Sequence, residues 1–185
     1  MTLIIVLAVI VLLAVWLISG YNGFVKKRNR VEEGFATMDV YLKKRFDIIP
    51  NLVSTVKGYA KHEKETLAEV VKARNNAISA KDLDERVTQE NAISGALGKL
   101  FALAENYPNL KADSQFLDLQ RQLENVENDI AQSRKYYNAV VKEFNTKCEM
   151  FPASIIAKMF SFKRFNMFEV SDETERENVK VSFDE

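Results

Sequence analysis

The chain has 185 residues, which is enough for one domain and an appended segment. Its 26 lysines and arginines balance its 26 aspartates and glutamates, so charge gives no reason to expect a nucleic-acid partner. The single cysteine, Cys148, excludes a disulfide framework and a cysteine-based metal site, and we expect it to be a small buried side chain.

Residues 1–21 are predicted to be a transmembrane anchor. The run LIIVLAVIVLLAVWLIS contains no charge, and as a helix it would cover roughly 25 Å, close to the thickness of a bilayer's hydrocarbon layer. Trp16 and Tyr21 lie near the C-terminal end of this run, where aromatic side chains are common at the membrane–water interface. A cleaved signal peptide is the alternative. No basic residue precedes Lys26 and no A-x-A site follows the run, which favours an uncleaved anchor.

The charges that flank this segment predict its orientation. Lys26, Lys27, Arg28 and Arg30 all lie on its C-terminal side. The positive-inside rule therefore places the N-terminus outside the cell (inner) membrane and the remaining chain in the cytoplasm. A domain on the extracytoplasmic side is the alternative.

Residues 22–151 are predicted to form an all-α domain. Apolar side chains recur at steps of three and four over 31–49, 53–77, 87–104 and 116–144, and no stretch alternates with the period of a strand. The connections between these ranges are short. We therefore expect an antiparallel, up-down-up-down four-helix bundle with long helices.

Two Pro-Asn-Leu tripeptides, at 50–52 and 108–110, are expected to break the helices. Asp82 and Asp113 are the expected N-caps of the third and fourth helices. A single helix that continues through Pro50 is the alternative to the first break.

The bundle topology would bring both Pro-Asn-Leu turns to the end farthest from the membrane. It would place the 79–84 turn and the exit of the fourth helix near the membrane. We interpret the distal turns as a candidate partner-binding tip, or else as simple chain turns. Its residues are Asp47, Pro50, Asn51, Pro108 and Asn109.

Residues 152–170 form an aromatic and basic segment that is expected near the membrane. It either contacts lipid or caps the open end of the bundle. The candidate lipid contacts are Lys158, Phe160, Phe162, Lys163 and Arg164. Residues 171–185 are acidic and are predicted to be a disordered tail.

The residues offer no catalytic site, cofactor site, metal site or small-molecule substrate site. His62 is the only histidine, and in HEKET the second histidine of a zinc protease is Thr66. We expect His62 to be an exposed surface residue. Within the bundle, Arg134 lies beside the apolar face of the fourth helix and is expected to pair with Glu33 or Glu90.

Several long motifs make the sequence similar to the LemA family. They include KKRFDIIPNLV within residues 21–74, ENYPNLKADSQFLDLQRQLENVENDI within 90–138, residues 140–162, and the closing KVSF. The resemblance implies a bacterial membrane-anchored protein with an antiparallel helical bundle. It implies no established enzymatic activity, cofactor or molecular function. Relatives often carry a tryptophan near Phe35, a departure expected to affect packing only.

Two functional hypotheses follow. The first is a non-enzymatic scaffold or adaptor that is held in the membrane lipid by its N-terminal helix and contacts an unidentified protein partner. The second is a membrane-surface protein that forms homo-oligomers and touches lipid.

Overall fold

A computed structural model of the chain describes residues 1–80 and 83–168, and these residues are helical with no strand among them. The long helices are α1 (Thr2–Tyr59), α2 (Lys64–Ser79), α3 (Leu83–Ala104) and α5 (Ser114–Glu149). Two short helices, α4 (Pro108–Lys111) and α6 (Ala153–Met159), precede and follow α5. The all-α prediction is confirmed.

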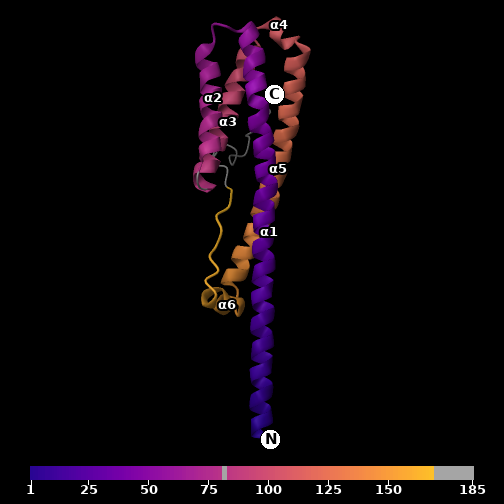
Figure 1. Cartoon of the computed structure of the whole chain (residues 1–185), viewed down its shortest axis with the longest axis vertical. Coiled ribbons are helices and arrows are strands. Elements are labelled where there is room, and N and C mark those ends of the chain that lie inside the picture. Colours follow the sequence, from indigo (N-terminus) through magenta and orange to yellow (C-terminus); the bar gives the residue numbers. More distant parts are fainter. Residues whose placement is uncertain (81–82, 169–185) are drawn as a thin grey trace, which may run out of the picture.

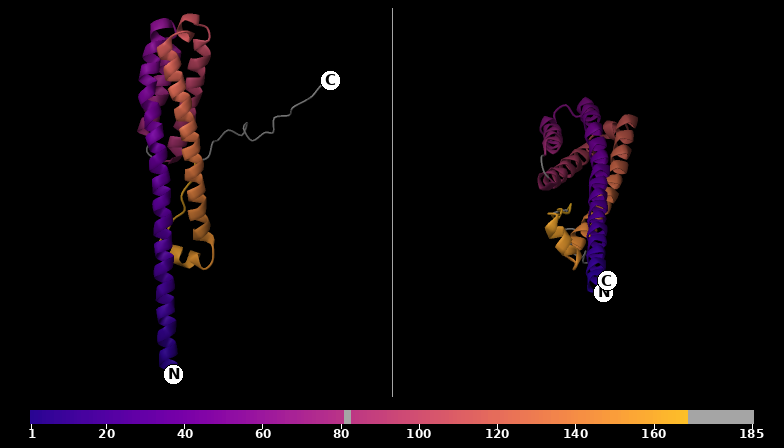
Figure 2. Two further views of the ribbon diagram at one scale, coloured as in Figure 1. Left: turned by 90° about the vertical axis from the view of Figure 1, so that its right-hand side faces the viewer. Right: turned by 60° about the horizontal axis from the view of Figure 1, so that its bottom comes forward.

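The N-terminal part of α1 projects beyond all other elements, and the rest of α1 forms the axis of the molecule (Figure 1). α5 packs along α1, while α2 packs on α1 and α3 packs on α2 (Figures 1 and 2). α3 and α5 face each other across a surface groove of about 620 Å³. The turn after α1 and the short helix α4 lie together at the distal end, and α6 lies at the opposite end of α5.

The expected break at Pro50 is wrong, because α1 is one helix of 58 residues with Pro50 inside it. A proline has no N–H to donate to the carbonyl four residues earlier, here that of Phe46. Arg74 on α2 supplies the missing donor, with its Nε 2.7 Å from the Phe46 carbonyl oxygen. A side chain from the neighbouring helix thus satisfies the group that the proline leaves unpaired.

Because α1 does not end at Pro50, the chain reverses ten residues later. Ala60 closes α1, and α2 begins at Lys64. The first turns of α3 also lie elsewhere than expected: Arg86 pairs with Asp39, well up α1 and far from the apolar segment. Asp82, the expected N-cap of α3, lies outside the described residues, as does the predicted acidic tail.

The prediction for the last long helix is confirmed in detail. All nine positions of its expected apolar face are buried, and Asp113 caps the helix by accepting a hydrogen bond from the Phe116 N–H at 2.8 Å. The nine are Phe116, Leu119, Leu123, Val126, Ile130, Ser133, Tyr137, Val140 and Phe144. The prediction succeeded because apolar residues recur at steps of three and four along the whole helix, which packs along α1.

The core has two parts. The distal part joins α1, α2, α3, α4 and the start of α5, whereas the proximal part joins α1, α5, α6 and residues 162–168, with Val87 of α3 at its upper end. Phe35 packs edge-on against Tyr137 with ring centres 5.9 Å apart. Its ring also lies 5.4 Å from the Arg86 guanidinium.

A buried charge cluster lies between these two parts. Arg45 of α1 and Glu90 of α3 are both fully buried and form an ion pair. Arg45 Nη1 also lies 2.7 Å from the Glu127 carboxylate of α5. Arg134 Nη2 lies 3.8 Å from Glu90, which confirms the second of its two expected partners. The cluster ties three helices together; Arg45 and Glu90 have no access to water, whereas the Glu127 side chain is 40% exposed.

Burial changes the pKa of the Arg134 side chain. Loss of solvent, reinforced by the nearby positive charge of Arg45, lowers the pKa of the Arg134 guanidinium to about 10. The guanidinium stays charged at neutral pH and lies 4.5 Å from the Phe168 ring centre. Arg134 therefore links the charge cluster to the C-terminal segment of the described chain.

Candidate functional site

The predicted tip is not assembled as expected. Asp47, Pro50 and Asn51 are exposed along the shaft of α1, whereas Pro108 and Asn109 begin α4 at the distal end. The distal end itself is built from the 60–63 turn and the residues around α4. Tyr59 donates to Asp113 at 2.8 Å and Tyr107 donates to Glu63 at 3.0 Å, which fastens the two turns together.

The Tyr59–Asp113 hydrogen bond acts in opposite directions on the pKa values of its donor and its acceptor. Hydrogen bonding to the carboxylates raises the pKa of both tyrosine hydroxyls. The backbone N–H of Phe116, followed by Tyr59, lowers the pKa of Asp113 below its usual value. The contribution of Asp113 to stability is therefore present above its ordinary pKa and is lost as the pH falls through the lower value in the folded protein.

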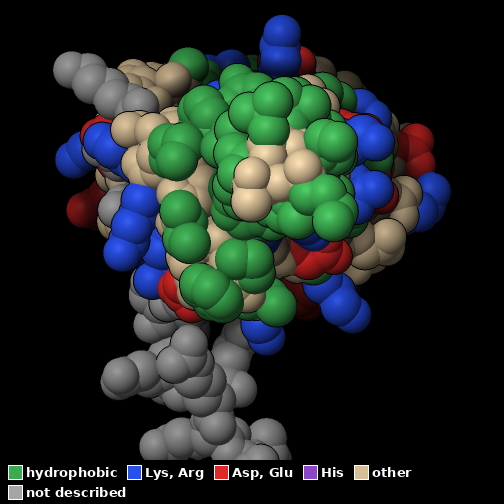
Figure 3. Space-filling view, turned by 90° about the horizontal axis from the view of Figure 1, so that it is seen from below, with side chains coloured by type: hydrophobic (Ala, Val, Ile, Leu, Met, Phe, Trp, Pro, Cys, Tyr) green, Lys and Arg blue, Asp and Glu red, His purple; other side chains and the backbone are tan. Residues whose placement is uncertain are grey.

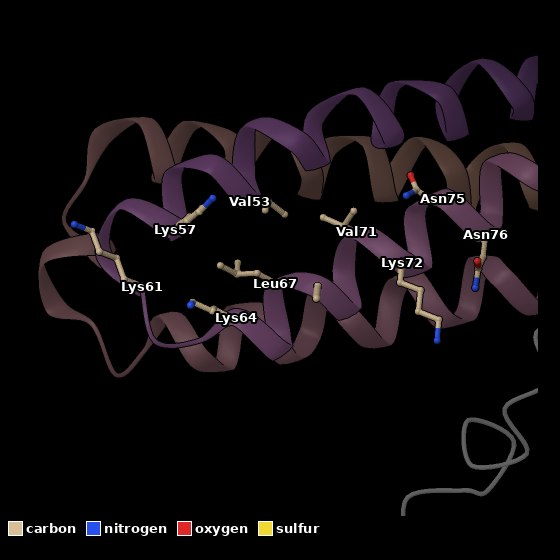
Figure 4. A pocket seen from close by; sticks show the side chains of 10 residues that line it. Val53, Lys57, Lys61, Lys64, Leu67, Val71, Lys72, Asn75 and Asn76 are labelled. Atoms are coloured by element: carbon tan, nitrogen blue, oxygen red, sulfur yellow. The ribbon is translucent and has the colours of Figure 1, made fainter.

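A recess lies just below this end, between α1 and α2. It is a groove of about 870 Å³ whose apolar side chains are Val53 on α1 and Leu67, Ala68 and Val71 on α2 (Figure 4). Val71 is exposed to solvent. Such a surface is concave and apolar, as ligand-binding surfaces usually are.

Lysine side chains surround the apolar floor. They are Lys57, Lys61, Lys64 and Lys72, and Asn75 and Asn76 close one end (Figure 4). None of the ten lining residues is acidic. Glu69, on another face of α2, is already paired with Lys99 at 2.6 Å. The groove therefore offers apolar contact together with the positive charge of four lysines.

Sequence reasoning missed this groove, because it placed residues 53–77 on one helix. In the structure Lys57 lies on α1, Lys61 in the turn and Lys64 at the start of α2. The reversal of the chain at residues 60–63, and not helical spacing, brings these lysines to one groove. His62, in the turn between α1 and α2, is exposed as expected.

A second candidate surface lies beside α1, at the level where its apolar segment ends. Of the expected lipid contacts, Lys158, Phe160 and Lys163 are exposed, and Arg164 is exposed but pairs with Glu149 at 2.9 Å. Phe162 instead packs inward, stacked on Phe24 with ring centres 4.8 Å apart. Phe162 thus closes the end of the helical core.

Residues 162–168 run back along α5 and are held by two asparagines of that helix. Asn145 donates to the Phe165 carbonyl at 2.8 Å and accepts from its N–H at 3.0 Å. Asn138, two turns earlier, does the same with Phe168 at 3.0 and 2.7 Å. Each amide side chain thus satisfies the backbone N–H and carbonyl of one residue, as a neighbouring strand would in a sheet. The spacing of seven residues places both on one face of α5.

Cys148 is partly buried beside this segment, where we expected full burial. Loss of solvent, followed by the charge of Glu149, raises the pKa of its thiol, so the less reactive protonated form is favoured. The described residues contain no cluster of three or more histidine, cysteine, aspartate or glutamate side chains able to hold a metal ion.

The helical fold and the apolar N-terminal segment define a class. One helix among the described residues, α1, is long and apolar enough to cross a membrane, and its apolar stretch is not buried against the rest of the chain. The chain is thus an all-helical protein with a segment able to span a bilayer.

The chain belongs to the LemA family, whose sequence pattern matches residues 34–183. It is 26% identical over 166 residues to Protein LemA of Metamycoplasma hominis, with 87% of this chain and 74% of that protein covered. It is also 23% identical over 190 residues to Magnetosome protein MamQ 2 of Paramagnetospirillum magneticum, with coverages of 89% and 70%. The family resemblance seen in the sequence motifs is confirmed.

Proposed function

We propose that this protein is a non-enzymatic adaptor, anchored in a bacterial inner membrane by the apolar part of α1, that binds a partner protein in the lysine-rimmed groove. On this proposal α1, α2, α3 and α5 form an antiparallel, up-down-up-down four-helix head. The observation that carries the proposal is the groove itself, an apolar floor with four lysines at its edge.

The charge and position of the groove define the partner. An acidic segment with apolar side chains on one face would satisfy both the lysines and the floor. Lys57 lies 36 residues beyond Tyr21 on one helix, about 50 Å along its axis. Lipid of the anchoring membrane cannot reach that far, so the favoured ligand is a polypeptide.

Photo-crosslinking in cells tests this binding. A photoreactive residue in place of Val71 is expected to give a discrete adduct with another protein, and the double charge reversal Lys57→Glu with Lys64→Glu is expected to abolish it. The matched control is Lys142→Glu on the exposed face of α5, which should leave the adduct unchanged.

The identity of the adduct decides between the hypotheses. A heterologous protein, captured by the Val71 variant and lost on charge reversal, supports the adaptor. An adduct between two copies of this chain would support the homo-oligomer instead. Labelling that appears only after truncation at Phe168 would show that residues 169–185, with seven acidic and two basic side chains, occupy the groove. No adduct at Val71, nor from Asn51 or Asn109, would contradict a distal binding surface.

The proposed side of the membrane rests on the basic residues after the apolar segment. Lys27 pairs with Glu143 at 2.8 Å, but Lys26 and Arg30 remain exposed beside it. We expect a C-terminal epitope to survive protease treatment of intact spheroplasts and to be digested after lysis. Digestion in intact spheroplasts would place the head outside the cytoplasm.

A further inference from the structure

Exposed apolar side chains gather at one place beyond the apolar segment of α1. Met150, Phe151, Ile155, Met159 and Phe160 lie within eleven residues, with Phe151 81% exposed and the others between 41% and 59%. Other large exposed apolar residues after Tyr21 occur singly along the helices, as on most proteins. We call these five residues the α6 surface.

Contacts with α1 fix the height of the α6 surface. Ile156, buried on the opposite face of α6, lies against Gly20, where a Cβ would come within 2.1 Å of its Cδ1. The ring of Phe160 lies 4.8 Å from that of Tyr21. Gly20 and Tyr21 directly follow the apolar segment, so α6 lies beside the point where that segment ends.

The segment after α6 is held in place, so this height is a fixed property of the fold. Phe162 stacks on Phe24, and the Asn145 side chain pairs with the backbone of Phe165. Lys147 Nζ lies 4.6 Å from the Phe24 ring centre on the same part of α1. An α6 fastened on both sides does not need a membrane to position it.

Basic side chains accompany the apolar ones. Lys158 and Lys163 are exposed next to the α6 surface, and Lys26, Arg28 and Arg30 are exposed on α1 one to two turns above. Viewed along α1 from its N-terminal end, hydrophobic side chains, those of the apolar part of α1 among them, occupy the centre (Figure 3). Lysines and arginines lie around them, together with some acidic side chains. Apolar side chains bordered by cations are typical of protein surfaces that rest on anionic lipid.

We propose that the α6 surface is a second membrane contact, inserted into the interfacial layer of an anionic lipid bilayer beside the α1 anchor. This inference rests on the proposed anchoring of α1. Phe151, Ile155 and Met159 enter the boundary between headgroups and acyl chains, to a depth of about 5–10 Å, as amphipathic helices do. Two separate contacts then restrict how the head can be oriented to the membrane.

Depth-dependent quenching in vesicles tests the proposal with the full-length chain. In a Cys148→Ser background, single cysteines at Ile10, Ile155 and Gln132 carry an environment-sensitive fluorophore. The vesicles contain phosphatidylcholine and phosphatidylglycerol with spin labels placed either near the acyl carbonyls or near the chain ends. Ile155→Cys should lose most of its fluorescence to the shallow quencher and less to the deep one, and Ile10→Cys should show the reverse order. Gln132→Cys, exposed on α5 within the head, should be quenched by neither.

The three positions separate the possible failures. Quenching at 10 but not at 155 would overturn the second contact and leave the anchor intact. Absence of quenching at 10 would overturn the anchor on which both proposals depend. Fluorophores at 155 that quench one another between copies, without quenching by lipid, would assign the α6 surface to self-association and also overturn the proposal. Replacing both Phe151 and Met159 with serine should reduce shallow quenching at 155 while leaving quenching at 10 unchanged.

Discussion

Replacing Arg45 with methionine is expected to reduce the free energy of unfolding by about 3–5 kcal/mol. The change leaves the fully buried Glu90 carboxylate without its principal counter-ion, with only Arg134 at 3.8 Å. It also removes the 2.7 Å bond to Glu127. Thermal unfolding of the full-length protein in detergent micelles, followed by circular dichroism, measures the loss.

A double variant shows that the penalty comes from the unpaired charge. Arg45→Met combined with Glu90→Leu should cost less than either single change, since a buried ion pair replaced by apolar side chains of similar size is often tolerated. Lys99→Met, which breaks an exposed pair with Glu69, is the matched control and should change stability by less than about 1 kcal/mol. Additive single effects would show that Arg45 and Glu90 do not depend on each other.

Replacing Arg74 with methionine is expected to cost about 1–3 kcal/mol, because the Phe46 carbonyl is left without a donor. The same change in a Pro50→Ala background should cost less, since the alanine N–H can bond to that carbonyl as in any helix. Pro50→Ala alone should stabilise the protein, because proline is unfavourable inside a helix. The unfolding measurements above give all three values.

The matched control is Lys72→Met, on the exposed side of the same helix, which should have little effect in either background. An equal cost for Arg74→Met with proline or alanine at position 50 would show that the Arg74 hydrogen bond does not compensate for the proline.

These two sites also explain where sequence reasoning succeeded and failed. The rules that predict a helix break at Pro50 use only the neighbouring residues. The hydrogen bond that allows the helix to continue comes from Arg74, which is 28 residues from the Phe46 carbonyl that it satisfies. A counter-signal was nevertheless present. The buried positions Leu42, Ile49, Leu52 and Val56 keep helical spacing straight across Pro50, as a continuous helix requires.

The candidate sites were less predictable than the helices. The groove depends on how α2 sits against α1. An error of ten residues at the first turn moved Asp47, Pro50 and Asn51 away from the tip, while Pro108 and Asn109 lie at the distal end as expected. Asn138 and Asn145 bind backbone groups of residues 165 and 168, in a segment without regular structure. Periodicity in the sequence cannot predict such contacts. Arg134, by contrast, was identified because an arginine beside an apolar face needs a nearby carboxylate.

Because α1 is one continuous helix, a movement at its N-terminal end is transmitted to its distal end. The proposed binding groove and the apolar stretch that we propose spans the membrane share one helix, so a rotation of the stretch is passed to the groove without a joint to absorb it. A change of 10° in tilt would move the groove sideways by about 9 Å. Bilayer thickness, which affects the tilt of spanning helices, would then determine how far to the side of the anchor point the partner is held.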